Sequence, residues 1–480
     1  MMTEDVVLLT TFTNASKKIR VIFHKSVLIW DYEKPPFEQK SVKLENIISV
    51  KPDYLKCSHP SKDPEIDPFS FTIHYGSRES CGKWKHKSLN LKHTDPLQVT
   101  SWIKTLEKQL GDLGQRPKKL LIFINPFGGR KNSMQIYTKY GKPLFEIAGM
   151  DVTVNVSQRK DQIRDYLING SLEMFDSVAC VGGDGTVSEL FNGLVLRECK
   201  IKGIEADNIN TPLPNPRIPV GIIPGGSTDT IAYCLHGTTD PTTAVFHIIY
   251  GDSVGLDLVS VYNENQLLKL YASVLSYGYL GDVAYNSDRH RWMGPQRYNY
   301  SGFKKLVANK GYQGEVAILT DNDDINTQKC YENCDTCKNE TGDEKVKAQW
   351  KTIKGKFFMI SGANISCACS KSPNGIAPYS HLGDGNMHLV LVRHGSFINN
   401  LRLLLNLSNK NKHIEELPFV ETYSAKEFCF RSLGSTSRWN CDGEIQHQAN
   451  IRAKVSRQLL TIFSRGRPVV AERETKCCGI

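Results

Sequence analysis

The segment that most strongly suggests chemistry is a glycine-rich loop with one acidic residue. Val181-Gly182-Gly183-Asp184-Gly185-Thr186 directly follows an apolar run and precedes a helical pattern that begins at Val187. Glycines let backbone N–H groups approach phosphate oxygens, and the following helix adds the positive end of its dipole. A carboxylate in such surroundings can accept a proton from a hydroxyl that attacks a γ-phosphate, or hold water on Mg²⁺. The alternative interpretation is a glycine–aspartate turn with a capping carboxylate.

Two further glycine loops follow apolar runs of the same kind. They are Asn125-Pro126-Phe127-Gly128-Gly129-Arg130 and Pro224-Gly225-Gly226-Ser227-Thr228-Asp229. Because ligands of parallel sheets bind beyond the carboxyl ends of the strands, the loops are predicted to face one crevice together with Asp184. The sequence contains no GxxxxGK[ST] loop and no HRD or DFG motif, and its glycine spacing differs from GxGxxG. P-loop, protein-kinase and dinucleotide chemistries are therefore not supported.

Short apolar strands followed by helices are predicted to position these loops. The strands are expected at 120–125, 152–156, 177–181 and 220–223. Strand, loop and helix repeating in this way indicate a mostly parallel α/β sheet. After about residue 251 strand patterns dominate, at 256–261, 357–360, 387–392 and 459–463, which predicts a C-terminal β-sandwich. The polar stretch 320–349 is expected to be an insertion or a mobile loop.

The N-terminal part has a different pattern. Short runs that alternate apolar and polar residues, separated by turns, predict a small antiparallel β domain between residues 6 and 91. An amphipathic helix is expected to close this domain, because apolar residues recur on one face: Val99, Trp102, Ile103, Leu106 and Leu110. Strands followed by one helix that carries a tryptophan resemble a pleckstrin-homology domain.

This resemblance implies a membrane contact near the first hairpin. In pleckstrin-homology domains basic residues there can bind phosphoinositide phosphates through charge-assisted hydrogen bonds, and Lys17, Lys18 and Arg20 are the candidates. The alternative is a solvated basic turn. A second basic stretch, 83–87 around Trp84, allows the same two interpretations.

The three glycine loops, in this order, resemble the diacylglycerol-kinase-type catalytic domain that sphingosine and ceramide kinases share, with the greatest likeness to the ceramide kinases. The likeness extends from about residue 118 to the C-terminus and rests on four segments: Phe123-Ile124-Asn125-Pro126-Phe127-Gly128-Gly129, Cys180-Val181-Gly182-Gly183-Asp184-Gly185, Gly278-Tyr279-Leu280-Gly281-Asp282 and Trp439-Asn440-Cys441-Asp442-Gly443-Glu444. It implies an active site between an α/β domain and a β-sandwich. The expected domains are 1–112, 118–252 and 253–480.

The resemblance also implies roles for individual residues. Segment 125–129, Glu189 and Ser227 would line ATP, and the Asp442-Gly443-Glu444 turn would help to place the phosphates and Mg²⁺, which prefers oxygen ligands. On the substrate side, Gly182, Gly183, Asp184, Gly185 and Asp282 are expected. Asp184 would accept the proton, and Asp282 would face the polar head of the lipid. For Asp282 a hairpin aspartate is the alternative interpretation.

A cysteine-rich run lies inside the polar insertion. Cys330-Tyr331-Glu332-Asn333-Cys334-Asp335-Thr336-Cys337 has the pattern CxxxCxxC, and Ser366-Cys367-Ala368-Cys369 follows further along the chain. Thiolates at these spacings can hold one Zn²⁺ in a closed tetrahedral site. The alternatives are redox-sensitive thiols and purely structural thiols, and the spacing assigns no ligand set.

Two further segments suggest partners. The stretch 397–412 is basic and amphipathic, which fits a helix that binds calmodulin or a membrane, although a leucine stripe of this kind is more often core. The terminal Cys477 and Cys478 are candidates for palmitoylation, whereas Gly479 argues against prenylation.

Composition sets the outer limits. Hydrophobic residues make up 40% and charged residues 23% of the 480 residues, which is typical of globular domains. The net charge of +10 favours an anionic partner, but no organised series of basic and aromatic residues points to nucleic acid. Without an apolar run long enough to cross a bilayer, the chain is expected to be cytoplasmic and peripherally bound to a membrane such as the Golgi or plasma membrane.

The sequence thus predicts a lipid kinase that uses ATP and Mg²⁺, with ceramide as the substrate that the resemblance implies. Sphingosine and diacylglycerol are alternative substrates, because the glycine loops do not distinguish them. A scaffold that binds nucleotide or lipid without catalysis is the alternative outside enzymes. Retention of Asp184, Asp442 and Glu444 argues against that scaffold.

Overall fold

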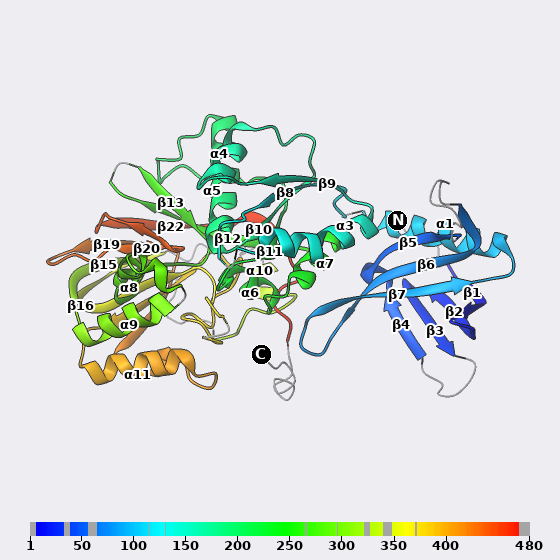
Figure 1. Ribbon diagram of the computed structural model, residues 1–480. Coiled ribbons are helices and arrows are strands. Elements are labelled where there is room, and N and C mark those ends of the chain that lie inside the picture. Colours follow the sequence, from blue (N-terminus) through cyan, green and yellow to red (C-terminus); the bar gives the residue numbers. More distant parts are fainter. Residues whose placement is uncertain are drawn as a thin grey trace.

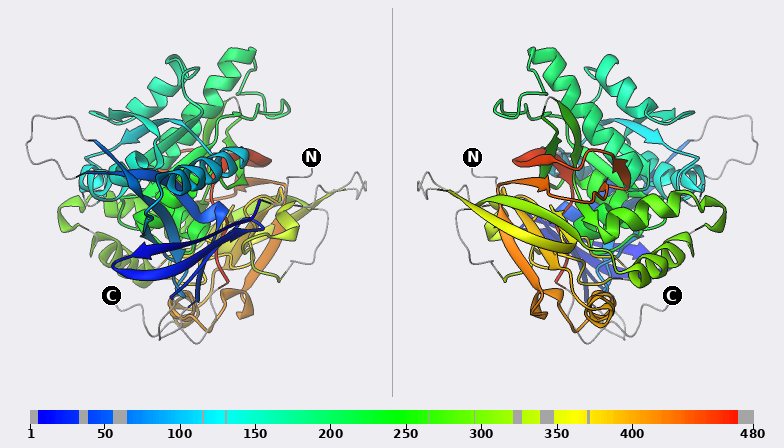
Figure 2. Two further views of the ribbon diagram at one scale, coloured as in Figure 1. Left: turned by 90° about the vertical axis from the view of Figure 1, so that its right-hand side faces the viewer. Right: turned by 90° about the vertical axis from the view of Figure 1, so that its left-hand side faces the viewer.

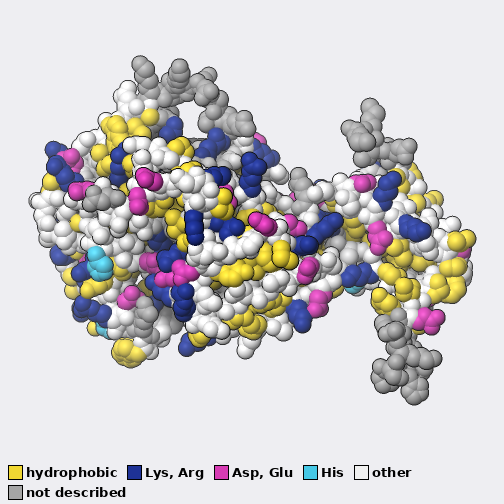
Figure 3. Space-filling view, turned by 90° about the horizontal axis from the view of Figure 1, so that it is seen from above, with side chains coloured by type: hydrophobic (Ala, Val, Ile, Leu, Met, Phe, Trp, Pro, Cys, Tyr) yellow, Lys and Arg dark blue, Asp and Glu magenta, His cyan; other side chains and the backbone are white. Residues whose placement is uncertain are grey.

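The computed structural model describes residues 6–32, 39–55, 65–114, 116–129, 131–264, 266–294, 296–320, 327–338, 348–369 and 372–469. An antiparallel β domain lies at one end of the molecule, and a larger α/β and β body lies at the other (Figure 1). Seen from above, the two meet at a narrow waist, and basic and acidic side chains are interspersed over this face (Figure 3).

The N-terminal domain is a seven-stranded antiparallel sheet in the order β4-β3-β2-β1-β7-β6-β5. Its strands are β1 (Leu8–Asn14), β2 (Lys17–His24), β3 (Val27–Tyr32), β4 (Gln39–Lys43), β5 (Ile47–Tyr54), β6 (Ile66–Arg78) and β7 (Trp84–Lys92). Helix α1 (Pro96–Asp112) follows, and the Asp95 side chain caps it by accepting from the backbone N–H of Leu97. Trp102 is buried and donates to Thr10 Oγ1 over 2.9 Å. The predicted pleckstrin-homology-like fold is confirmed.

The second domain contains four parallel strands in the order β9-β8-β10-β11. They are β8 (Lys119–Ile124), β9 (Asp151–Val156), β10 (Ser177–Gly182) and β11 (Val220–Pro224). The helices between and after them are α2 (Ser133–Ile136), α3 (Lys142–Ala148), α4 (Gln162–Asn169), α5 (Asp184–Lys202), α6 (Thr230–His236) and α7 (Pro241–Tyr250). Apart from the exposed Lys119 and the buried Ser177 at their first positions, β8, β10 and β11 consist of buried apolar residues and glycine, as is typical of parallel strands covered on both faces.

The C-terminal region is rich in antiparallel strands. They are β12 (Ser253–Tyr262), β13 (Leu267–Tyr271), β14 (Val274–Gly278), β15 (Tyr312–Thr320), β16 (Gln349–Ala363), β17 (Met387–Arg393), β18 (Val420–Ala425), β19 (Glu427–Ser432), β20 (Trp439–Cys441), β21 (Glu444–Gln446) and β22 (Ile451–Phe463). In the right panel of Figure 2, the yellow and orange strands of this region lie toward the viewer. The predicted β-rich C-terminal region is confirmed.

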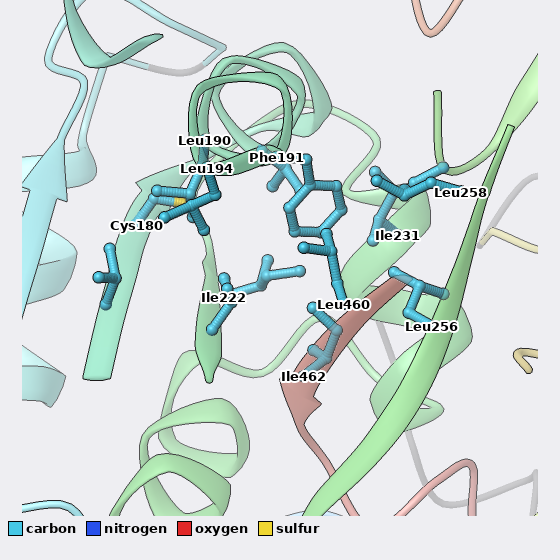
Figure 4. Close-up of a cluster of buried hydrophobic side chains, with 14 of the residues drawn as sticks. Cys180, Leu190, Phe191, Leu194, Ile222, Ile231, Leu256, Leu258, Leu460 and Ile462 are labelled. Atoms are coloured by element: carbon cyan, nitrogen blue, oxygen red, sulfur yellow. The ribbon is translucent and has the colours of Figure 1, made fainter. Parts of the chain in front are cut away.

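Strand β22 joins the α/β sheet to the β-rich region. It pairs antiparallel with β12 and β19, and parallel with β11 through Val220 and Ile462. Figure 4 shows the core at this junction, to which β10, α5 and β22 contribute Cys180, Phe191 and Leu460. Both parts therefore share one sheet and one core, which holds the ends of β10, β11 and β14 in fixed relation.

The C-terminal region also contains more helix than the sequence indicated. Strands were expected with few helical segments, yet α8 (Tyr279–Asp288), α9 (Gln296–Ala308) and α11 (Phe397–Ser408) are present, besides the short α10 (Asp335–Lys338). The apolar residues of α9 do not reveal it, because Phe303 and Val307 are exposed and do not form a buried stripe. On α11, Leu403 is buried, whereas Ile398 and Leu405 are exposed, so its leucines divide between core and surface.

The N-terminal domain packs against the α/β body through α7. Trp84 is buried, its ring lies 5.5 Å from that of Tyr250, and its backbone N–H donates to Thr243 Oγ1. Arg465 lies over the Trp84 ring at 5.1 Å and donates to Asn46. The basic stretch 83–87 is thus built around an interdomain contact.

No helix in the described ranges has the length and apolar composition required to cross a bilayer.

Candidate active site

The three glycine loops lie directly against one another. A side chain at Gly129 would have its Cβ 2.6 Å from the Cα of Gly226, and a side chain at Gly226 would come within 2.5 Å of the Cα of Gly183. The backbone N–H of Gly225 also donates to the carbonyl of Gly182 over 3.0 Å. Since real Cβ atoms do not approach so closely, only glycine fits here, and the loops form one backbone-lined surface.

Asn125 fixes the first loop against the start of α5. Its Oδ1 accepts the backbone N–H groups of Phe127 and Gly128 at 3.0 and 3.1 Å, and its Nδ2 donates to Thr186 Oγ1 at 3.0 Å. Both polar atoms of the side-chain amide therefore form hydrogen bonds that shape the loop. Phe127 itself is 64% exposed. The neighbouring Arg130 lies outside the described residues.

Asp184 occupies the first turn of α5 and points at the start of α6. Its Oδ2 and Oδ1 accept the backbone N–H groups of Thr230 and Ile231 at 3.1 and 3.0 Å. Burial raises the pKa of its carboxyl to about 6, although the hydrogen bonds from the two backbone N–H groups act in the opposite direction. The negative charges of Asp229 and Asp442 add to the increase. A carboxyl with a pKa this close to neutrality can exchange a proton with a substrate hydroxyl.

Asp229 is a further acidic residue of the site that sequence reasoning quoted only as part of a loop. It is buried, has a φ of 52°, and accepts the backbone N–H of Gly226 at 2.8 Å. It thereby shapes the third glycine loop. Asp229 directly precedes α6, but its side chain does not cap that helix, so a capping pattern in the sequence would not have identified this role.

Ser133 was also missed. Its side chain is fully buried next to Gly225, and its Oγ has no hydrogen-bond partner among the described residues. An unpaired buried hydroxyl beside a phosphate-type loop is where a ligand oxygen would complete the hydrogen bonding. No local motif in the sequence indicated this.

Asp442 reaches the same region from the far end of the chain. It and Gly443 have φ values of 46° and 86°, as a tight hairpin requires, and they connect β20 to β21. Its carboxylate accepts the backbone N–H groups of Ala272, Ser273 and Val274 and the hydroxyl of Ser273. The carboxylate therefore anchors the turn between β13 and β14.

Glu444 and Glu189 line a shared cavity of about 170 Å³. Burial opposes ionisation of Glu444, but ion pairs with Lys269 at 2.7 Å and Lys160 at 3.5 Å lower its pKa below the usual value. Burial raises the pKa of Glu189. Its Oε2 is buried and has no hydrogen-bond partner in the ranges that the structure covers. The cavity thus presents an unpaired acceptor.

Asp282 lies in the first turn of α8, so the hairpin interpretation is wrong. Its side chain is buried, accepts the Ser437 hydroxyl at 2.7 Å, and also accepts the hydroxyl of Tyr312. Burial raises the pKa of the Tyr312 hydroxyl, which therefore stays protonated as a donor. Helix α8 contacts β20, the strand that leads into Asp442.

The candidate phosphoinositide residues lie where the first hairpin was expected. Lys17 and Lys18 are exposed at the start of β2, and the Lys17 ammonium lies 5.9 Å from the Tyr32 ring centre. Arg20 pairs with Asp31 at 2.8 Å, so part of its charge is already neutralised.

The cysteine cluster has a different composition from the one that the spacing suggested. The side chains of Cys330, Cys334 and Cys337 converge on His381, with all four ligand atoms within 4.8 Å of one another. Cys367 instead donates to the backbone carbonyls of Ser273 and Ile365. The fourth group is therefore a histidine, which no cysteine pattern could predict.

The site fits ATP and Mg²⁺ in its chemistry. The glycine surface leaves backbone free to approach phosphates, and the exposed Ser227 adds a hydroxyl. Asp442 and Glu444 supply carboxylate oxygens, which Mg²⁺ prefers. Oδ1 of Asp442 already accepts three hydrogen bonds, so only its Oδ2, which accepts one, keeps a lone pair for a cation.

Comparisons with known proteins agree with this architecture. Residues 8–106 match the family described as the ceramide kinase PH domain, 119–261 the diacylglycerol kinase catalytic domain, and 273–438 the ceramide kinase C-terminal domain. The chain is 33% identical to ceramide kinase of Mus musculus over 90% of this chain and 91% of that protein. It is 32% identical to ceramide kinase of Homo sapiens, with 90% of both covered.

A crystal structure assigned as a diacylglycerol kinase from Bacillus anthracis str. Sterne has a similar fold. Its TM-score is 0.51 at 16% identity, and the match covers 73% of this chain and 96% of that one. At this identity the likeness concerns the fold alone.

Proposed function

This chain belongs to the ceramide kinase family, and from that premise we propose that it transfers the γ-phosphoryl group of ATP to the primary hydroxyl of ceramide, which gives ceramide 1-phosphate. The observation that supports this most strongly is the contact of Gly129, Gly183 and Gly226 beside the carboxyl of Asp184. A glycine surface suits the phosphates, and the neighbouring carboxyl suits the proton.

Asp184 is proposed as the proton acceptor. The backbone N–H groups of Thr230 and Ile231 hold its carboxylate in one orientation. With a pKa of about 6 it is mostly ionised at pH 7 and still basic enough to take the proton of an attacking hydroxyl. Because those amides belong to α6, the third glycine loop and the proton acceptor move as one unit.

We propose that segment 125–129, Ser227 and Glu189 line the nucleotide. ATP with Mg²⁺ would supply the phosphoryl group and neutralise charge on it when bound. The unpaired Oε2 of Glu189 accepts from a hydroxyl or amino group of the nucleotide in this assignment, and the backbone N–H groups of the glycine loops donate to its phosphates.

The β20–β21 hairpin is proposed to complete the phosphate side. Asp442 acts here mainly through position, since it fixes the β13–β14 turn and adds negative charge near Asp184, where a cation is favoured. Glu444 faces the cavity that it shares with Glu189 and is kept ionised by Lys269. In this proposal both carboxylates belong to the β-rich region and help to place Mg²⁺.

For the lipid side we propose Asp282 and the surface above it. Asp282 with Tyr312 and Ser437 forms a buried polar group suited to the hydroxyls and amide of a sphingolipid head. Next to it, α9 and the turn before it expose large apolar side chains: Trp292 at 82%, Phe303 at 67% and Val307 at 57%. Helix α11, which contacts α9, exposes Ile398 and Leu405.

This apolar surface of α9 and α11 is proposed to contact the bilayer that holds the substrate. Lys304, Lys305 and Lys310 lie on or directly after α9, and cations beside exposed aromatic residues suit an anionic membrane interface. A bilayer contact here brings the lipid to the end of the molecule where α8 positions Asp282.

We also propose further partners. Lys17 and Lys18 would bind phosphoinositide phosphates, whereas Arg20 already forms an ion pair with Asp31. We propose that calmodulin binds the exposed face of α11, which carries Arg402, together with Lys410 and Lys412 after the helix. We place the enzyme at the cytoplasmic face of a membrane such as the Golgi or plasma membrane, and a Zn²⁺ ion at the cysteine cluster.

Purified protein should be offered ceramide, sphingosine and diacylglycerol in mixed micelles with ATP and Mg²⁺, and the phosphorylated products resolved. We expect ceramide 1-phosphate as the dominant product. Sphingosine phosphate or phosphatidic acid as the main product would replace the substrate assignment. ATP binding without any lipid product would instead support the non-catalytic scaffold.

A further inference from the structure

Four potential metal ligands converge at the edge of the β-rich region. Cys330, Cys334 and Cys337 come from the segment 327–338, and His381 comes from the loop before β17. The Sγ atoms of Cys330 and Cys337 are 3.7 Å apart, and the Sγ of Cys334 lies 3.1 Å from Nδ1 of His381. All four residues lie within the described ranges.

These separations match a metal site better than the alternatives for paired thiols. Two sulfurs bound to one tetrahedral Zn²⁺, each at about 2.3 Å, lie about 3.8 Å apart, close to the separation of Cys330 and Cys337. A disulfide would bring them to about 2.05 Å. Thiols that merely filled space would have no reason to meet a buried imidazole at hydrogen-bond distance.

The imidazole of His381 is oriented as a metal ligand. Its Nε2 lies 3.1 Å from the backbone carbonyl of Gln328, so this nitrogen carries the proton and donates. Nδ1 is then the unprotonated nitrogen and faces the three sulfurs. In zinc sites, the ring nitrogen of a ligand histidine that does not bind the metal commonly donates to a backbone carbonyl.

We propose that Cys330, Cys334, Cys337 and His381 bind one Zn²⁺ as its complete protein ligand set, and that this ion is structural. Three thiolates and one imidazole suit Zn²⁺, whereas Mg²⁺ and Ca²⁺ prefer oxygen. Four protein ligands leave no open position for a substrate, which distinguishes a structural ion from a catalytic one. None of the four residues lies in the glycine loops, so this site and the kinase site stand or fall separately.

The ion would join the segment 327–338 to the loop that carries His381. Within the metal-binding segment, Glu332 forms a two-point ion pair with Arg78 of β6, at 2.5 and 3.0 Å. Its backbone N–H also donates to the carbonyl of Arg467, and the carbonyl of Cys337 accepts from Gln458 of β22. Zinc would therefore hold in place Glu332, one of the residues that join the N-terminal domain to the catalytic body.

A cavity of about 950 Å³ borders the site and gives the metal a route of entry. Its lining includes the three cysteines together with Arg78 and Trp84 of the N-terminal domain. The site is thus placed at the junction of the two bodies, and zinc binding should stiffen this junction.

The test begins with metal analysis of the full-length protein, purified without chelators. We expect about one zinc per chain, and a Co²⁺-substituted sample should show the intense visible absorption of a tetrahedral thiolate site. Cys334→Ser and His381→Ala should each lower zinc affinity more than tenfold. Cys429→Ser, in β19 and outside the tetrad, is the matched control and should keep its zinc.

Wild-type protein without stoichiometric zinc that also takes up none from micromolar free Zn²⁺ would overturn the site. Full zinc content in Cys334→Ser would overturn the ligand set. If a cysteine variant fails to fold, reversible chelation of the wild-type protein gives the same comparison.

The structural role has its own readout in hydrogen exchange. Removal of zinc should speed amide exchange in 327–338 and at the end of β6 near Arg78, while exchange in β10 stays unchanged. Glu332→Gln should keep zinc but speed exchange near Arg78 alone. Unchanged exchange in both segments after zinc loss would contradict the proposed clamp.

Discussion

Burial raises the pKa of Asp184 to about 6, and the carboxylate of Asp442, which is far away in the chain, adds to that increase. The two carboxyl groups are therefore close enough in space for their charges to interact. A change at Asp442 should therefore also affect the ionisation of Asp184.

The first prediction concerns the pH dependence of the reaction. Asp184 can accept a proton only when ionised, and burial raises its pKa to about 6, assisted by Asp229 and Asp442. We expect kcat/KM to fall about tenfold per pH unit below pH 6 and to level off above pH 7. Lipid phosphorylation in a buffer series checks this. A flat profile between pH 5 and 7 would contradict the role of Asp184.

The second prediction concerns the stability of a variant at the same residue. The folded-state pKa of Asp184 is raised from 3.8 to about 6, so the folded protein binds this proton more tightly than the unfolded chain does. Stability is therefore highest below about pH 4 for this group and is lost as pH rises through 6, by about 3 kcal/mol at most.

Asp184→Asn removes that cost. The new amide also replaces one of the two oxygens that accept a backbone N–H, and this loss does not depend on pH. We therefore expect the stability of the variant relative to wild type to be greater at pH 7 than at pH 4.5. Calorimetry at both pH values measures it, and Asp151→Asn, at an exposed position on β9, is the control. A relative stability that is the same at both pH values would contradict the raised pKa of Asp184.

The third prediction separates position from charge at the β20–β21 hairpin. Asp442→Asn places an amide against backbone donors, so we expect a loss of about 2–3 kcal/mol in the free energy of unfolding. Glu444→Gln retains an oxygen that can accept from the ammonium of Lys269, whose side chain is only 8% exposed, so this variant should cost less than Asp442→Asn. Chemical denaturation measures both. Equal effects would remove the anchoring role of Asp442.

Sequence reasoning located the glycine loops because their signals are local. Each loop follows a strand so apolar that its pattern leaves little choice, and β10 and β11 begin and end within a residue of the expected bounds. The role of Asp442 was only partly accessible. Its hairpin can be read from Asp-Gly, but its hydrogen bonds to Ala272 and Val274 depend on tertiary structure.

Two features had no local signal at all. His381 lies far from the cysteine run in sequence and joins it only because the chain returns before β17. Helix α9 escaped because its large apolar residues, such as Phe303, point outward, whereas amphipathic patterns are assumed to report a buried face.

That outward face leads to the fourth prediction. Trp292→Ala and Phe303→Ala should each weaken binding to vesicles that contain anionic lipid by about 5- to 30-fold, because burial of such a side chain contributes about 1–2 kcal/mol at an interface. Leu97→Ala, 76% exposed on α1, is the control. Vesicle cosedimentation checks this. Equal binding of all three variants and wild type would remove α9 from the membrane contact.

The most direct test of the central claim is the rate at which Asp184→Asn phosphorylates ceramide, compared with wild type and Asp151→Asn under saturating ATP and Mg²⁺. If Asp184 accepts the proton beside the glycine loops, its variant should lose at least about 100-fold in kcat while its ATP affinity stays within about twofold. A turnover rate near that of Asp151→Asn would contradict the claim.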